Sequence, residues 1–119
     1  MSSVRAAKGD LLLEEALLDL EHGCLNKATG GFYFAVRWFA EKLLVKLGAP
    51  VPRRDDKLAN AVMSVGGAGP ARALRILYNL RLKADYSELS VTREEAEYAK
   101  KLALEAVGEL KKLIGRADE

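Results

Sequence analysis

Apolar residues return every three or four positions along most of this chain, a spacing that fits a helix and no other regular structure. Glycine and proline interrupt the pattern, and between them it predicts helices over residues 8–23, 26–47, 55–65, 70–84 and 92–114. No stretch alternates apolar and polar residues for long enough to make a strand. We therefore expect an all-α fold, an up-and-down helical bundle of four long helices and one short one.

Local signals define several of the helix ends. Gly23 and Gly48 are predicted stops, because glycine readily takes the left-handed conformation that ends a helix. Pro70 fits the first turn of a helix, where its missing N–H costs nothing. Thr92 with Glu95 three residues later predicts a capping box at the start of the last helix.

Length and composition indicate one domain over residues 1–119, with an ordered core at about 8–114. The chain has 119 residues, of which 50% are hydrophobic, enough for one core. Its formal net charge of +2 gives no general attraction to nucleic acid. A lone cysteine, Cys24, favours a reduced, cytoplasmic protein. No apolar stretch reaches the ~18 residues of a membrane span, so no membrane association is expected.

The residues that usually carry metal or cofactor chemistry are scarce. His22 is the only histidine, and with Cys24 nearby it supplies too few ligands for a zinc site. The glycines over residues 66–69 do not fit a phosphate-binding loop, because no strand precedes them and Pro70 removes a backbone donor. We expect no metal and no cofactor.

The second predicted helix carries more large apolar residues than one core covers. Gly30 and Gly31 weaken its first turns, so it begins either at Asn26 or just after the glycines. Aromatic side chains then surround it: Phe32, Tyr33, Phe34, Trp38 and Phe39. Tyr33 and Trp38 anchor either the core or a contact with a second chain. We expect a homodimer, with Tyr33, Arg37 and Trp38 at its interface.

The fourth predicted helix is basic. Arg72, Arg75, Arg81 and Lys83 precede its first acid, Asp85. Arg72 and Arg75 are expected to share a face that continues to Lys83. Such a stripe either binds phosphates or is a solvated face paired with acids elsewhere.

Several motifs together resemble the HEPN family (higher eukaryotes and prokaryotes nucleotide-binding), in its small stand-alone prokaryotic branch. Residues 81–86 read Arg-Leu-Lys-Ala-Asp-Tyr, and a short loop leads to Ser-Val-Thr-Arg-Glu-Glu-Ala at 90–96. Residues 33–35 read Tyr-Phe-Ala, followed by Ala-Glu-Lys-Leu-Leu at 40–44. The resemblance extends over roughly residues 8–113 and rests on the order and spacing of these motifs.

The resemblance implies a helical bundle that forms a homodimer and often pairs with a minimal nucleotidyltransferase in toxin–antitoxin-like modules. Active members are metal-independent ribonucleases with an arginine followed, four to six residues later, by a histidine. Here Arg81 takes the arginine position, but Asp85 and Tyr86 stand where the histidine would be, a variant usual in this branch. Without an imidazole, no side chain there has a near-neutral intrinsic pKa for proton transfer.

The leading hypothesis is therefore a non-catalytic HEPN-type domain that homodimerises and binds a partner protein or a nucleotide. The alternatives are a ribonuclease that uses Arg81 and Tyr86, and a purely structural, self-associating module. The phosphate-binding or nucleotide-binding candidates are Arg81, Asp85, Tyr86, Arg75 and Lys83. In a structural role, Asp85 would instead cap its helix or pair with Arg81, and Tyr86 would pack its ring against a neighbouring helix.

Overall fold

The computed structural model describes residues 7–118, which form helices joined by loops and turns. The helices are α1 (Lys8–Glu21), α2 (Leu25–Lys46), α3 (Asp55–Ser64), α4 (Ala68–Tyr86) and α5 (Arg93–Ala117). The predicted all-α class is confirmed, and every predicted helix end lies within three residues of the observed one. The second helix begins before its two glycines, at Leu25, and the fourth begins at Ala68, two residues before Pro70.

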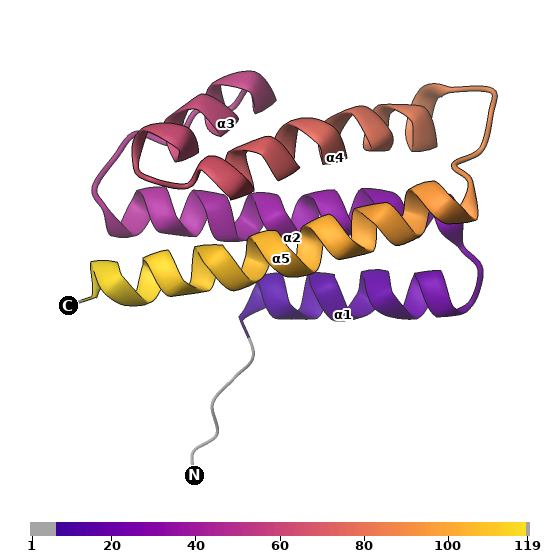
Figure 1. Ribbon diagram of the computed structural model, residues 1–119, viewed down its shortest axis with the longest axis horizontal. Coiled ribbons are helices and arrows are strands. Elements are labelled where there is room, and N and C mark those ends of the chain that lie inside the picture. Colours follow the sequence, from indigo (N-terminus) through magenta and orange to yellow (C-terminus); the bar gives the residue numbers. More distant parts are fainter. Residues whose placement is uncertain (1–6, 119) are drawn as a thin grey trace, which may run out of the picture.

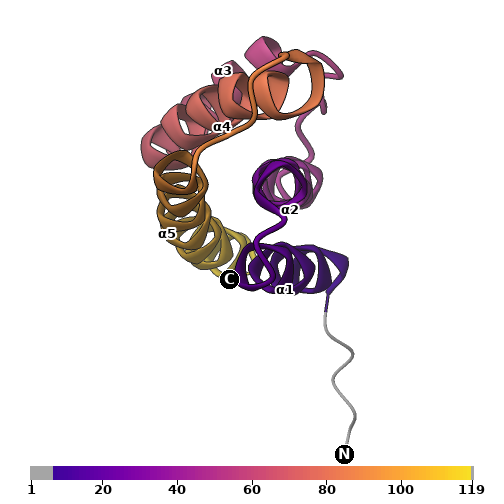
Figure 2. The same cartoon turned by 90° about the vertical axis from the view of Figure 1, so that its right-hand side faces the viewer.

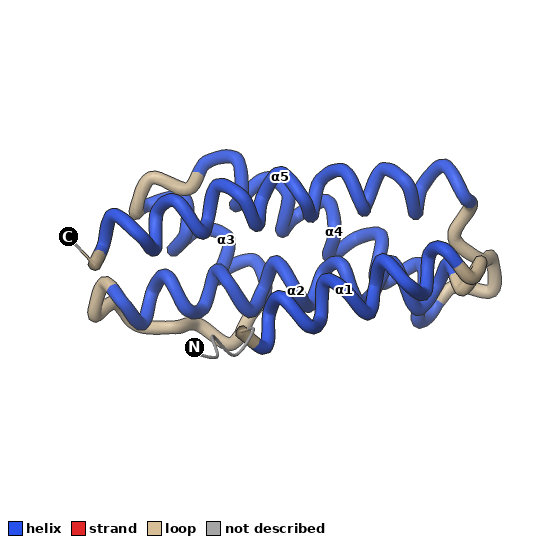
Figure 3. Tube along the Cα trace, turned by 90° about the horizontal axis from the view of Figure 1, so that it is seen from below, coloured by secondary structure: helices blue, strands red, loops and turns tan. Residues whose placement is uncertain are grey.

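The four long helices run alternately up and down, and the short α3 packs against α4 (Figure 1). Seen from below, the chain reverses direction at the two ends of the bundle (Figure 3). Helix α2 contacts α1, α4 and α5, whereas α1 and α4 do not contact each other. Viewed along the helices, α4, α5 and α1 form an arc around one side of α2 (Figure 2). The opposite side of α2 is left without a covering helix from residues 7–118.

The core lies between α2 and this arc. Phe32, Val36, Phe39 and Leu43 of α2 are almost fully buried at positions one helical turn apart. A row of small residues on α5 faces them, with Ala99, Ala103 and Ala106 among its buried positions. Small side chains on α5 let the two helices approach closely, which leaves room for the large α2 side chains.

Two of the predicted helix stops are Schellman motifs. Gly23 follows α1 with φ +79°, and the Cys24 N–H donates to the Asp19 carbonyl at 2.8 Å. Gly48 follows α2 with φ +70°, and the Ala49 N–H donates to the Leu44 carbonyl at 2.9 Å. A side chain at either position would be strained, which explains why glycine ends both helices.

The two adjacent glycines of α2 lie in different surroundings, which gives a matched test of helix packing. A Cβ on Gly31 would lie 2.9 Å from the Ala16 Cβ, so α1 and α2 would have to shift. A Cβ on Gly30 would meet nothing within 4 Å. We expect Gly30→Ala to stabilise the fold by roughly 0.5–1 kcal/mol, because alanine favours a helix over glycine. We expect Gly31→Ala to destabilise it by about 1–2 kcal/mol through overpacking. Urea denaturation measures both, and equal stability of the two variants would contradict this close approach.

Candidate functional site

Arg81 lies against two aromatic rings where α4 passes α2. Its guanidinium carbon is 4.9 Å from the centre of the Phe34 ring and 5.5 Å from the centre of the Tyr33 ring. Both distances are within cation–π range. The two rings meet edge to face, with centroids 5.2 Å apart. The arginine side chain is thus held by stacking and retains only 21% of its accessible surface.

The hydrogen-bonding capacity of Arg81 is largely unused. Its Nε lies 3.3 Å from an oxygen of Asp85, one helical turn later, as the four-residue spacing predicted. That contact is an ion pair without hydrogen-bond geometry, and the buried Nε has no hydrogen-bond partner. Among residues 7–118, no acceptor takes a hydrogen bond from this guanidinium. The unsatisfied buried Nε carries a desolvation cost, whereas the Nη groups are not buried and can donate to an acceptor supplied from outside the chain.

Asp85 and Tyr86 extend the site to the end of α4. The Asp85 side chain is 40% exposed, and Tyr86 is 73% exposed with no hydrogen bond from its hydroxyl to any described residue. The alternative in which Tyr86 packs against a neighbouring helix is therefore wrong. Both side chains can contact another molecule.

The uncovered side of α2 carries further aromatic and charged groups beside Arg81. Phe34 is 43% exposed, and Trp38, one turn later, is half-buried with the Lys42 amine 6.0 Å from its ring centre. A shallow hollow of about 290 Å³ lies here between α2 and the start of α1. We call this surface the Phe34 face: Phe34, Arg37, Trp38 and Glu41 of α2, with Arg81 and Asp85 of α4.

Arg37 is bound within the chain and is not free to contact a partner through its donors. Its Nη1 donates to the Tyr33 hydroxyl at 3.0 Å and to the Asp55 carboxylate at 2.5 Å. Its Nη2 donates to the Arg53 carbonyl at 2.9 Å, and its Nε donates to Glu41 at 3.3 Å. Arg37 thus ties α2 to the start of α3 and to the segment before it. Burial raises the pKa of the Asp55 carboxyl, and the Arg81 charge limits this rise.

The three predicted interface residues differ in position. Trp38 and Arg37 both lie on the Phe34 face, but the donors of Arg37 are occupied by bonds within the chain, and Tyr33 is only 1% exposed. Tyr33 therefore belongs to the interior of a single chain. The interface prediction did not include Phe34, the exposed aromatic residue of this face, although its spacing from Trp38 and Glu41 is helical and its position is opposite the buried stripe. That spacing was the signal that could have found it.

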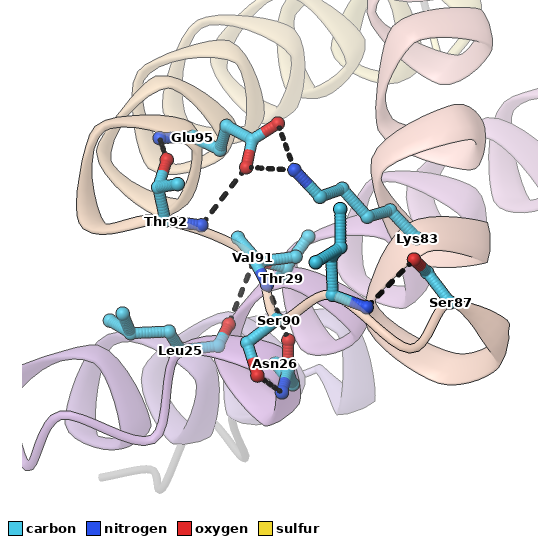
Figure 4. A network of polar contacts seen from close by, with 10 residues as sticks. Leu25, Asn26, Thr29, Lys83, Ser87, Ser90, Val91, Thr92 and Glu95 are labelled. Carbon is cyan, nitrogen blue, oxygen red and sulfur yellow. Dashed lines mark hydrogen bonds and ion pairs between the residues drawn. The ribbon is translucent and has the colours of Figure 1, made fainter.

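Lys83 does not join Arg81. Its amine donates to both oxygens of Glu95, at 2.8 and 3.1 Å, and so links α4 to α5 (Figure 4). Glu95 also completes the predicted capping box with Thr92, which is confirmed. Beside this pair, the Asn26 side chain accepts from the Val91 N–H at 2.9 Å and holds the α4–α5 loop against α2. Lys83 therefore has a structural partner and is not placed to bind phosphate with Arg81.

The Lys83–Glu95 pair predicts a pH-dependent stability. Hydrogen bonds from Lys83 and Thr92 lower the pKa of Glu95 below its ordinary value of 4.5. Stability from this lowered pKa is fully present above pH 4.5 and is lost as the pH falls through the folded-state value. We expect Glu95→Gln to cost about 1 kcal/mol at pH 7 and progressively less below pH 4.5. Thermal unfolding from pH 7 to pH 3 measures this, and a constant difference between the two proteins would contradict it.

The other basic residues of α4 do not form one stripe. Arg72 lies at a hollow between α4 and α5 that Glu105 and Glu109 also line. Arg75 instead lines a groove between α3 and α4, and its Nη2 donates to the Asn60 side chain at 2.6 Å. The expected face shared by Arg72 and Arg75 is therefore divided between two sides of the helix.

No group of three or more histidine, cysteine or acidic side chains is placed to hold a metal ion within residues 7–118. In the same part of the chain, no helix combines the length and apolar character that crossing a membrane requires. No protein-family model matches the chain, and a search of curated proteins finds no match.

Proposed function

We propose that this chain is a non-catalytic HEPN-type domain that pairs with a second copy of itself through the Phe34 face and binds a partner protein or a nucleotide. The partner expected from the resemblance is a minimal nucleotidyltransferase in a toxin–antitoxin-like module. The observation that carries the proposal is the position of Arg81. Its side chain stacks on Phe34, its buried Nε has no hydrogen-bond partner, and no helix of residues 7–118 covers the surface on which it lies.

The charges of the Phe34 face favour self-association over contact with a strongly acidic or basic partner. The face carries Arg81 beside Asp85 and Arg37 beside Glu41, so each cation has an acid next to it. In a two-fold symmetric contact the same patch meets itself, which requires both signs of charge on one surface. Exposed Phe34 and half-buried Trp38 supply the apolar centre that such contacts use.

The unused donors of Arg81 suit a phosphate or a carboxylate equally well, since a guanidinium binds either in a bidentate manner. This supports binding of a nucleotide phosphate or of an acidic side chain from a partner. We propose no chemistry on that phosphate, because Asp85 and Tyr86 stand where the histidine of active members would be and provide no imidazole.

Replacing Arg81 with methionine tests the proposal, because methionine keeps an apolar stem and removes the charge and all donors. Arg93→Met is the matched control: Arg93 also pairs with an acid four residues later, but it is 56% exposed and lies on α5. We expect the unaltered chain and Arg93→Met to sediment as dimers. We expect Arg81→Met to dissociate at concentrations at least tenfold higher, a loss of about 1.4 kcal/mol. Monomers throughout, or equal dissociation of both variants, would count against the proposal.

Ribonuclease activity is the second candidate, and the exposure of Tyr86 beside the Arg81–Asp85 pair favours it. Cellular RNA incubated with the purified chain, with Tyr86→Phe and with Arg81→Met separates the two candidates. The non-catalytic proposal predicts no cleavage, or a trace equal in all three proteins. Cleavage that disappears in both variants would establish the ribonuclease instead.

A further inference from the structure

A second groove lies between the start of α3 and the middle of α4. Its volume is about 480 Å³, within the roughly 300–1,000 Å³ of small-molecule sites. The residues that line it are Arg54, Asp55, Asp56, Leu74, Arg75, Tyr78 and Asn79.

Most of the charges around this groove already have partners. Arg54 pairs with Asp56 at 3.0 Å, and Asp55 pairs with Arg37 of α2. Arg75 is the exception, because its one bond goes to the neutral amide of Asn60. No carboxylate of residues 7–118 lies within ion-pair distance of Arg75. The groove therefore presents one cation whose charge is not balanced.

The wall of the groove beside Arg75 combines apolar surface with unused polar groups. Leu74 is buried beneath it, and the half-buried ring of Tyr78 lies one turn further along α4. The Tyr78 hydroxyl and the Asn79 amide make no hydrogen bond to any described residue. An apolar wall with a few polar groups directed to one place is the usual construction of a small-molecule site.

We propose that this groove binds a small organic carboxylate with a flat, apolar body. The carboxylate pairs with Arg75 and accepts hydrogen bonds from Tyr78 or Asn79, while the body lies on Leu74 and the Tyr78 ring. A carboxylate fits better than a phosphate ester, because Asp55 and Asp56 line the same groove and repel a dianion more strongly than a monoanion. Neither Phe34 nor Arg81 lines this groove, so benzoate binding here and dimer formation are measured separately, although Asp55 in its wall is bonded to Arg37 of the Phe34 face.

Backbone amide shifts of the ¹⁵N-labelled chain at neutral pH test the site, with benzoate as the probe. Benzyl alcohol is the uncharged comparison, and phenyl phosphate is the dianionic one. For a ligand of this size we expect a Kd on the order of 1–10 mM. The saturating shifts should centre on residues 74–79. Benzyl alcohol and phenyl phosphate should each bind at least threefold more weakly.

Two arginine variants test which side chain provides the positive charge that binds benzoate. Arg75→Gln should weaken benzoate binding at least tenfold, whereas Arg72→Gln, one turn earlier and facing α5, should leave it unchanged. Both side chains are exposed, so neither change should prevent folding. The proposal is overturned by an absence of saturating shifts at residues 74–79, by equal binding of benzyl alcohol, or by equal loss in the two variants. Tighter binding of phenyl phosphate would overturn the assignment to a carboxylate.

Discussion

Replacing Arg37 with alanine is expected to lower the free energy of unfolding by about 2–4 kcal/mol, a large effect for one charged residue. Arg37 joins the Tyr33 hydroxyl, the Asp55 carboxylate and the Arg53 carbonyl, and its side chain is only 19% exposed. Its removal takes from the Asp55 carboxylate, 24% exposed, the only cation that forms a direct ion pair with it among residues 7–118. A mostly buried charge without a partner is what makes such truncations costly.

Urea denaturation at pH 7 measures this loss, with Arg54→Ala as the control. Arg54, the residue before α3, pairs with Asp56 in the first turn of that helix, but the two side chains are 71% and 61% exposed. An exposed, solvent-screened pair of this kind should contribute far less to stability than the Arg37 contacts. Adding Asp55→Asn to Arg37→Ala should restore part of the lost stability, because the unpaired charge is then gone. If both single arginine variants lose the same small amount, Arg37 does not connect α2 to α3 as described.

Replacing Phe34 with glutamate is expected to raise the dimer dissociation constant at least a hundredfold, or about 2.8 kcal/mol, if the Phe34 face is the proposed dimer contact. The change removes the ring on which Arg81 stacks and adds a carboxylate near Asp85 and Glu41. In a two-fold contact each substitution occurs twice, so the added charges also repel across the interface.

Leu104→Glu is a close control for this prediction. Leu104 is also 43% exposed, but it lies on α5, away from the Phe34 face. Circular dichroism should show that both variants stay helical, because both positions are at the surface. Sedimentation equilibrium then compares the dissociation constants. A dimer that tolerates Phe34→Glu but not Leu104→Glu would move the contact to α5.

The helices could be predicted from the sequence because their signals are local. Periodic apolar residues mark the buried stripe of α2, glycines at 23 and 48 end α1 and α2, and the Thr92–Glu95 capping box begins α5. The Arg81–Asp85 pair could also be predicted from the sequence, because residues four apart on one helix are neighbours whatever the helix packs against.

The parts of the site that join different helices could not be predicted in this way. Arg37 reaches Asp55 from 18 residues away, and Lys83 reaches Glu95 across the α4–α5 turn. Such contacts depend on how the helices cross and rotate, which periodicity within each helix does not determine. For the same reason Tyr33, which the sequence left open between the core and an interface, could not be assigned in advance to the interior.

The emission of Trp38 is the most direct test of the proposed dimer contact. It is the only tryptophan of the chain and lies on the Phe34 face, so excitation selective for tryptophan reports on that surface alone. Diluting the protein should shift the emission to longer wavelength and increase quenching by acrylamide, in one transition that matches dissociation of the dimer in sedimentation. A dimer that dissociates while the emission and quenching of Trp38 stay constant would show that the two chains meet elsewhere.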